Sequence, residues 1–343
     1  MRLAVCAFAL AAVNSFAQPY AAFRTTDDSV EIVRLTDKAR AMEVSIAPSV
    51  GNNAYEFKVN GRNVFWFPDA IGKARAAQTF AANPFLAPWA NRLDGDAFWA
   101  NGKKYTLNPE LKNLRRDPNG RPIHGLLAWF PGWRVVKLAA GDRGAEVTSR
   151  LEFSKYPDLM AQFPFAHTIE MTYRLADGAL EVRTRFENLA TEPMPLVVGY
   201  HPYFRLYDAP RDRWKVHVAA RDHVEISKEL VPTGERTRIA LPDPVSLATN
   251  QLDDVFDNLV RGADGRAEFW VQGVREKISV IYGPKYNTAI VYAPPGREFI
   301  CIEPMTGVTN GANLAHAGVY KDLQTVPPGG AWEESFWIKP AGF

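Results

Sequence analysis

The chain has 343 residues, with 40 Lys and Arg against 38 Asp and Glu, so its formal net charge is only +2. No long run of one charge sign occurs, and this balance excludes the clustered basic surface of a nucleic-acid-binding protein. A small neutral or modestly charged molecule is the favoured partner. A chain of this length can bury a large core without disulfides.

The first residues are typical of an export signal. Arg2 provides a positive start, an apolar stretch covers residues 3–13, and a small-x-small cleavage site precedes Gln18. The apolar stretch is shorter than the ~20 residues of a membrane span, and no later segment supplies one. The pattern predicts a signal peptide over residues 1–17 and an exported protein, periplasmic or secreted. The alternative is a buried N-terminal helix or strand.

Alternation of apolar and polar residues, the pattern of half-buried strands, dominates the rest of the chain. In the clearest case, two alternating runs at 168–175 and 180–186 flank the turn Asp177-Gly178, which predicts a β-hairpin. Further strands are predicted at 42–46, 145–151, 214–218, 277–282, 288–292 and 332–338.

Helical patterns are few. Short helices are predicted only at 74–80 and 314–317, and Gly and Pro are spread through the chain without marking a linker. We therefore predict one all-β domain of packed antiparallel sheets over residues 18–343. A division into two domains is compatible with the length, but no shift in composition supports it.

Glu303 ends an apolar run and directly precedes Pro304. A carboxylate with apolar neighbours is costly to desolvate, so its presence favours a functional role. Proline has no N–H to donate and tends to end a strand, which predicts that Glu303 lies at a sheet rim, where a general base can meet a substrate. Cys301 is the only cysteine after the predicted signal and is interpreted as a small buried apolar residue, without a disulfide.

Four loop-like segments concentrate polar groups beside aromatic residues, at 84–93, 121–127, 198–204 and 299–307. With two further motifs, they resemble the aldose 1-epimerase (galactose mutarotase) family in the correct order over nearly the whole chain after residue 17. The matching motifs are Asn91-Arg92 followed by Gly95, His124-Gly125-Leu126, His201-Pro202-Tyr203-Phe204, Pro232-Thr233-Gly234, Asp253-Asp254-Val255-Phe256 and Glu303-Pro304-Met305-Thr306.

The resemblance implies a large antiparallel β-sandwich (a supersandwich, galactose mutarotase-like) with few short helices. It also implies an isomerase that interconverts α and β anomers of a hexose by acid/base ring opening and reclosure. That reaction removes a proton from the C1 hydroxyl and delivers one to the ring oxygen, tasks that suit a carboxylate and an imidazolium. The resemblance assigns them to Glu303 as general base and His201 as general acid. The substrate-binding residues that it implies are Arg92, His124, Asp253 and Asn91.

Two departures leave alternatives open. Family members often carry Asn-His-Ser-Tyr-Phe-Asn around the second histidine, whereas this chain has His201-Pro202-Tyr203-Phe204 followed by Arg205. That form is similar to divergent branches, some of which act on hexose phosphates, so a neutral aldohexose and a phosphorylated sugar both stay open. The family aspartate is either Asp253 or Asp254, and the spacing to Phe256 favours Asp253.

The His, Cys and Asp residues show no metal-ligand spacing, so neither a metal nor a cofactor is predicted. Two other functions remain: a glycoside hydrolase that uses Glu303 and Asp253 as its carboxylate pair, and a carbohydrate-binding protein without turnover. The histidines argue against the hydrolase, and the presence of both an acid and a base argues against binding alone. The other histidines, such as His217, are interpreted as structural or exposed. The pattern does not indicate an oligomeric state.

Overall fold

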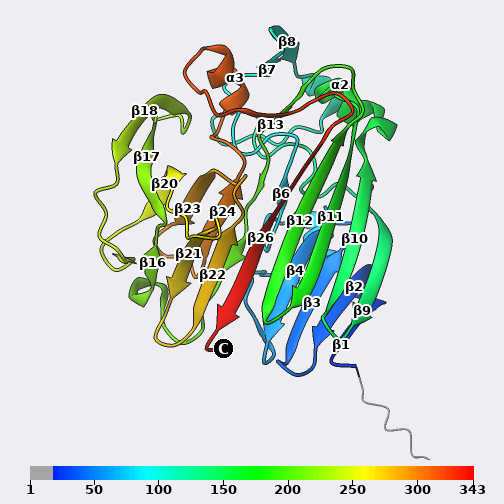
Figure 1. Ribbon diagram of the computed structural model, residues 1–343, viewed down its shortest axis with the longest axis vertical. Coiled ribbons are helices and arrows are strands. Elements are labelled where there is room, and N and C mark those ends of the chain that lie inside the picture. The colour runs from blue at the N-terminus through cyan, green and yellow to red at the C-terminus, as the bar shows by residue number, and fades with distance from the viewer. Residues whose placement is uncertain (1–17) are drawn as a thin grey trace, which may run out of the picture.

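Antiparallel strands dominate the computed structural model, which describes residues 18–343, and its helices are few and short (Figure 1). This confirms the predicted all-β sandwich. The predicted signal peptide, residues 1–17, lies outside the described residues. None of the helices within 18–343 is long and apolar enough to cross a membrane.

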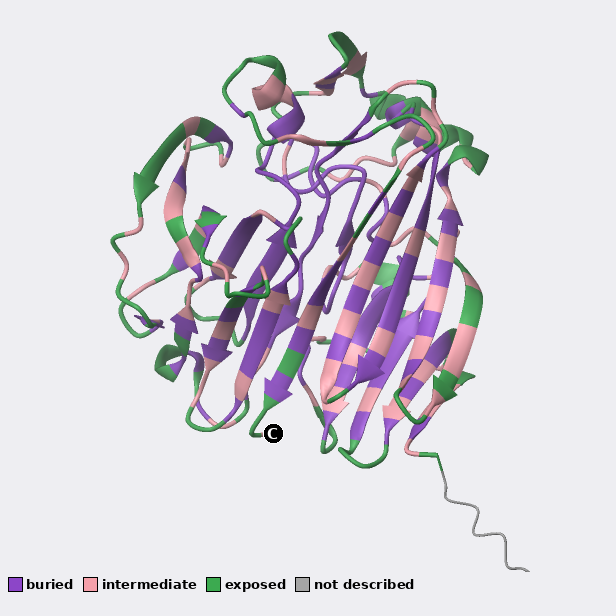
Figure 2. Cartoon of the chain, viewed as in Figure 1, coloured by how far each residue is buried: buried purple, intermediate pink, exposed green. Residues whose placement is uncertain are grey.

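The largest sheet has nine strands and contains the predicted hairpin. At the hairpin turn, Asp177 and Gly178 have φ of 52° and 76°, the double left-handed conformation of a tight two-residue turn. Buried and partly exposed residues alternate along the second strand of the hairpin, residues 179–188, as period-2 patterning requires, whereas the first strand, residues 167–176, is buried at most positions (Figure 2). In sheet order the strands are β19 (Val245–Ser246), β16 (Lys215–His217), β21 (Ala267–Gln272), β22 (Lys277–Tyr282), β26 (Ala331–Ala341), β12 (Ala179–Asn188), β11 (His167–Ala176), β10 (Gly144–Glu152) and β9 (Arg134–Gly141).

A five-stranded sheet from the N-terminal part of the chain lies against β9–β11 (Figure 1). Apolar side chains of the two sheets, such as Val33 and Leu35 on one and Val147 and Leu151 on the other, share one core. Its strands are β1 (Tyr20–Asp27), β2 (Val30–Asp37), β3 (Met42–Ala47), β4 (Asn53–Val59) and β5 (Arg62–Asn63).

The third large sheet positions the polar residues that the motifs single out. One face contributes Phe256, Val291 and Ile302 to the main core, and because side chains alternate along a strand, neighbouring residues such as Glu303 project from the other face. In order its strands are β18 (Pro232–Arg238), β17 (Ala220–Ile226), β20 (Leu252–Leu259), β23 (Thr288–Ala293), β24 (Ile300–Met305), β14 (Gly199–Tyr200) and β6 (Phe85–Leu86), and β15 (Tyr203–Phe204) also pairs with β24.

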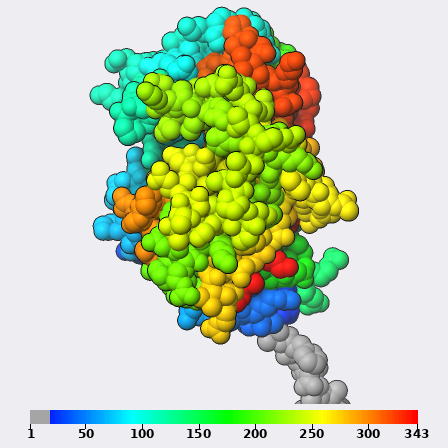
Figure 3. All heavy atoms as spheres, turned by 90° about the vertical axis from the view of Figure 1, so that its left-hand side faces the viewer, coloured from blue at the N-terminus to red at the C-terminus, as the bar shows by residue number. Residues whose placement is uncertain are grey.

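Short elements complete the fold. Viewed from the side of β17 and β18, the middle part of the chain forms most of the surface, with the orange-red segment that includes α3 near the top (Figure 3). The short strand pairs are β7 (Ala97–Ala100) with β8 (Lys103–Thr106) and β13 (Met194–Leu196) with β25 (Gln324–Val326). The helices are α1 (Ile71–Ala77), α2 (Pro157–Gln162) and α3 (Gly311–His316), with 3-10 turns at Pro109–Leu111, Phe153–Lys155 and Arg211–Arg213.

Both predicted helices exist but are displaced toward the N-terminus. The helix expected at 74–80 begins at Ile71, whose side chain is buried with that of Ala74, and it ends where Gln78 adopts a φ of 51°. The helix expected at 314–317 spans Gly311–His316. Packing of one or two side chains decides the bounds of helices this short.

Candidate active site

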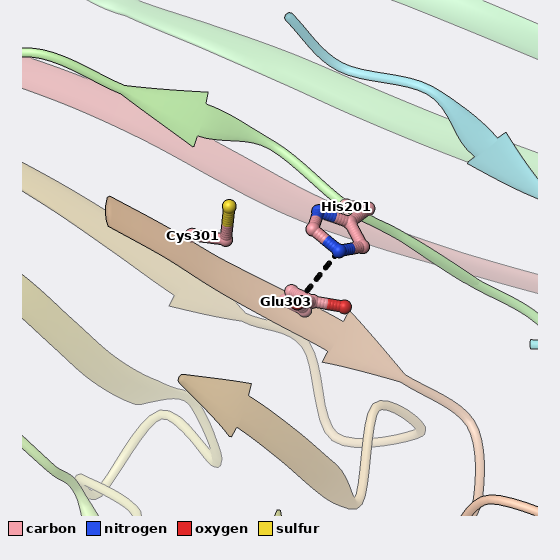
Figure 4. A group of neighbouring side chains, drawn as sticks. All are labelled: His201, Cys301 and Glu303. Atoms are coloured by element: carbon pink, nitrogen blue, oxygen red, sulfur yellow. Dashed lines mark ion pairs between the residues drawn. The ribbon is translucent and has the colours of Figure 1, made fainter. Parts of the chain in front are cut away.

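Glu303 and His201 form a buried pair across two neighbouring strands. β24 pairs antiparallel with β14 at Gly199↔Met305 and with β15 at Tyr203↔Cys301. His201 lies between β14 and β15, so the same register places it opposite Glu303. His201 Nε2 is 3.2 Å from Glu303 Oε1, and the residues are 7% and 1% exposed (Figure 4).

Pro304 does not end its strand, and the prediction that Glu303 lies at a sheet rim is wrong. β24 continues through Met305, and Glu303 and Pro304 pair with Ile290 and Ala289 of β23. On the other side of β24 the ladder is interrupted between β14 and β15, so the missing N–H of Pro304 falls beside a break. A proline is tolerated where no ladder hydrogen bond is required of it. Glu303 therefore projects from the face of an interior strand.

Burial moves the pKa values of the pair in opposite directions. It raises the pKa of Glu303 well above the ordinary carboxyl value; the charge of Asp253 raises it further, and Arg92 partly offsets the shift. Burial also lowers the pKa of His201, and the positive charges of Arg115 and Arg92 lower it further. Both shifts favour the uncharged forms, since a low-dielectric site penalises charge. The pair therefore holds one transferable proton between Oε1 and Nε2.

A cleft of about 340 Å³ opens onto this pair. All six residues singled out from the sequence border it, although they come from five separate segments of the chain. Its lining includes Asn91, Arg92, His124, His201, Asp253, Tyr292, Glu303 and Thr309 together with apolar residues of β17, β20 and β23.

Of the two adjacent aspartates, only Asp253 borders the cleft. Asp254 points to the opposite face of β20, where its Oδ1 accepts a hydrogen bond from His223 Nε2 at 2.9 Å. Asp253 is exposed at the mouth of the cleft, and partial desolvation by its neighbours raises its pKa; the charge of Arg92 counteracts this shift, and that of Asp254 adds to it. The geometry thus agrees with the choice of Asp253 made from spacing.

Asn91 and His124 reach the cleft from irregular backbone. Both have left-handed φ values, 54° and 65°, and the His124 N–H donates to the Asn91 carbonyl at 2.8 Å. Left-handed backbone at residues other than glycine is uncommon and concentrates at functional sites. His124 Nδ1 has no hydrogen-bond partner within residues 18–343. Burial lowers the pKa of His124, and the neighbouring His201 imidazole and the positive charges of Arg115 and Arg92 lower it further, so the His124 imidazole is neutral.

Arg92 is held in place by a buried carboxylate. Its Nε donates to Asp117 Oδ2 at 2.7 Å, while Asp117 Oδ1 accepts the backbone N–H groups of Asn119 and Arg121, both at 2.9 Å. Asp117 therefore orients a guanidinium that has further donors for the cleft. Sequence reasoning missed Asp117, because an aspartate before Pro118 reads as a turn residue.

Arg115 and Phe80 are further neighbours of the site that the sequence did not reveal. The Arg115 guanidinium carbon lies 4.1 Å from the Phe80 ring centroid and 5.3 Å from that of Trp129. Phe80 in turn stacks on His124, with ring centroids 4.8 Å apart, and meets His201 edge-on at 5.2 Å. Arg115 Nη1 is buried without a hydrogen-bond partner among residues 18–343. The charged run Arg115-Arg116-Asp117 gives no local sign of this placement.

Aromatic residues near the motifs divide between core and site. Trp89 and Trp133 are buried in the main core, whereas Tyr203 stacks on His201 with centroids 4.7 Å apart. Tyr292 borders the cleft from β23. Chemically, the site presents a proton-sharing carboxylate–imidazole pair, one further carboxylate, one oriented guanidinium and aromatic rings, a set suited to a polyhydroxylated ligand.

The sequence and the fold both have known relatives. A family profile described as "Aldose 1-epimerase" matches residues 31–339. The chain is 22% identical to the Escherichia coli (strain K12) protein YihR over 235 residues, which are 66% of this chain and 70% of YihR.

Solved structures share the architecture. A galactose mutarotase-like protein from Clostridium acetobutylicum superposes with a TM-score of 0.83 at 20% identity, covering 95% of this chain and 99% of its own. The galactose 1-epimerase from Lactobacillus acidophilus NCFM gives a TM-score of 0.74 at 14% identity, with 95% and 100% covered. At such identities the similarity establishes the fold, and it confirms the expected mutarotase-like sandwich.

Proposed function

Because this chain belongs to the aldose 1-epimerase family, we propose that it interconverts the α and β anomers of an aldohexose. The observation that carries the proposal is the buried Glu303–His201 pair, whose carboxylate oxygen and imidazole nitrogen lie 3.2 Å apart at a cleft. Simple binding of hydroxyl groups does not require a pair that shares a transferable proton.

Ring opening uses this pair as base and acid. With the shared proton on His201, Glu303 is a carboxylate and His201 an imidazolium. Glu303 accepts the proton of the C1 hydroxyl while His201 donates one to the ring oxygen, and the bond between C1 and the ring oxygen breaks to give the open-chain aldehyde. The pair then consists of a carboxylic acid and a neutral imidazole, the uncharged arrangement that burial favours. Rotation about C1–C2 and the reverse transfers close the other anomer.

The remaining residues orient the sugar. Arg92, fixed by Asp117, and Asp253 bind hydroxyl groups, and the neutral His124 with Asn91 holds the ring oxygen side of the substrate. Fixing the sugar in this way positions C1 and the ring oxygen for proton transfer. We place the enzyme outside the cytoplasm on the pattern of its first residues, which favours an unphosphorylated hexose.

Polarimetry or NMR of freshly dissolved α-glucose and α-galactose tests the proposal. The wild-type protein is expected to accelerate the approach to anomeric equilibrium over buffer. Glu303→Gln is expected to lose about 10²–10⁴-fold of that acceleration, the usual contribution of a general base. His201→Asn is expected to lose a comparable factor.

His217→Asn is the matched control, because His217 is a histidine of β16 that bonds Asp243 at 2.7 Å and does not border the cleft. It should retain the wild-type rate. Equal losses in His201→Asn and His217→Asn would remove His201 from the acid role, and no acceleration by wild type across several aldoses would reject the proposal. Release of sugar from aryl glycosides would favour a hydrolase, and saturable binding without turnover a lectin-like protein.

A further inference from the structure

Cys301 lies beside the catalytic pair, and the proposed reaction gives it no role. Its thiol can bind metal ions. It lies two residues before Glu303 on β24, so both side chains project from the same face of the strand. His201 lies in the segment between β14 and β15, opposite Glu303. The Cys301 sulfur, one imidazole nitrogen of His201 and one carboxylate oxygen of Glu303 all lie within 4.8 Å of one another (Figure 4).

These separations are close to those around a bound zinc ion. Zinc takes four ligands in a tetrahedron at about 2.3 Å for sulfur and about 2.0–2.2 Å for nitrogen and oxygen, which separates the ligand atoms by roughly 3.3–3.6 Å. The His201–Glu303 distance of 3.2 Å already matches this spacing. The two distances from the Cys301 sulfur to the other ligand atoms are at most 4.8 Å, so about 1 Å of side-chain movement brings them into the zinc range.

From this geometry we propose that Cys301, His201 and Glu303 form a binding site for Zn²⁺ that inhibits the enzyme. Thiolate, imidazole and carboxylate are the three side-chain ligand types of zinc, and the thiolate disfavours the hard cation Mg²⁺. The fourth position would face the cleft and take water. Glu303 Oε2 and His201 Nδ1 have no hydrogen-bond partner in the part of the chain that the structure describes, so zinc binding breaks no hydrogen bond at these two atoms.

Zinc and the reaction compete for the same lone pairs. Binding requires a thiolate, a carboxylate and a neutral imidazole, so the thiol proton of Cys301 and the proton shared by Glu303 and His201 pass to the solvent. A pair that holds zinc has no proton to exchange with a sugar. Inhibition therefore rests on the proposed function, whereas zinc binding does not.

Cobalt absorption provides the direct test, because Co²⁺ replaces zinc in such sites and a thiolate ligand adds a charge-transfer band in the near ultraviolet. We expect the reduced full chain to develop this band on addition of Co²⁺ and to lose it on addition of Zn²⁺. Cys301→Ala should show no band and bind zinc at least about tenfold more weakly by calorimetry, since even outer-shell changes at zinc sites cost roughly 10–100-fold. His217→Asn, which alters a surface histidine paired with Asp243, should behave as wild type.

Activity supplies the second readout. Zinc is expected to slow anomerisation by the wild type in step with site occupancy, a chelator to restore the rate, and Cys301→Ala to resist zinc relative to its own zinc-free rate. Absence of the cobalt band, or equal zinc affinity in wild type and Cys301→Ala, would overturn the metal site even if anomerisation is observed. A cobalt band in a protein that never accelerates anomerisation would support the metal site and reject the proposed function. Should Cys301→Ala fail to fold in thermal melts, Cys301→Ser serves instead, since its hydroxyl is a poor zinc ligand.

Discussion

Asp253 and Asp254 are adjacent in sequence, yet their carboxylates serve opposite faces of β20. Asp253 borders the cleft, and its charge contributes to the raised pKa of Glu303. Asp254 instead forms a charge-assisted hydrogen bond with His223. Side chains alternate between the two faces of a strand, so of two adjacent carboxylates one faces the cleft and the other faces away from it.

Asparagine substitutions at these two positions separate the roles. Asp253→Asn is expected to lower kcat/KM by about 10-fold or more, since a hydrogen bond donated to a charged group is worth about 1.5–3 kcal/mol. It should also shift the acid limb of the pH–rate profile to lower pH, because removing a negative neighbour lowers the pKa of Glu303. Asp254→Asn should leave both quantities near the wild-type values. If Asp254→Asn instead lowered kcat/KM and Asp253→Asn did not, Asp254 would be the substrate-binding aspartate.

Among the structural elements, the turn at His124-Gly125 determines how an imidazole enters the cleft. Gly125 has a φ of 66°, and a Cβ atom there would lie 2.2 Å from the Ala87 carbonyl oxygen. Ala87 and Gly125 form an isolated bridge, and the Leu126 N–H donates to the Ala87 carbonyl at 2.7 Å. The segment of 84–93 and that of 121–127 are thereby joined by backbone contacts that only glycine permits.

Alanine at Gly125 is compared with alanine at Gly120, which also has a left-handed φ, 79°, but open space around its missing side chain. Gly120→Ala should cost only the backbone strain, about 1–2 kcal/mol. Gly125→Ala should lower the free energy of unfolding by clearly more in denaturant titrations, because it adds a clash with backbone. In the folded fraction it should also raise KM by displacing His124. Equal losses of stability would mean that the close contact with Ala87 is unimportant.

At the scale of the whole molecule, the buried polar groups of the active site lower the free energy of unfolding of the sandwich. The large sheets bury a common apolar core, and the cleft places polar groups on a face whose other side belongs to that core. Burying an ionisable carboxyl without full hydrogen bonding costs free energy. Glu303, whose Oε2 lacks a partner in residues 18–343, represents this cost.

Glu303→Gln is therefore expected to stabilise the protein at neutral pH while it lowers activity by about 10²–10⁴-fold. The folded-state pKa of Glu303 is raised, so the wild type loses stability as pH rises from the ordinary carboxyl pKa through the folded value. Each pH unit between those two values corresponds to about 1.4 kcal/mol. Thermal melts from pH 4 to pH 8 should show Glu303→Gln gaining relative to wild type as pH increases. A loss that grows with pH would instead indicate a Glu303 carboxylate stabilised by an imidazolium.

The sequence by itself determined the fold class and most of the candidate site. Alternation predicted the hairpin of β11 and β12 and located β22 and β23, because period-2 patterning is a local property of a half-buried strand. The ordered motifs identified six residues, from Asn91 to Glu303, that all border one cleft in the structure.

Only the tertiary structure decided which groups act on one another. Strand pairing placed His201 opposite Glu303 and carried β24 through Pro304, and loop packing brought Arg115 to Phe80. Register, burial and the resulting pKa shifts depend on contacts between distant segments, which no local pattern encodes. For the same reason Cys301 looked like an ordinary core residue until the fold placed its sulfur beside an imidazole and a carboxylate.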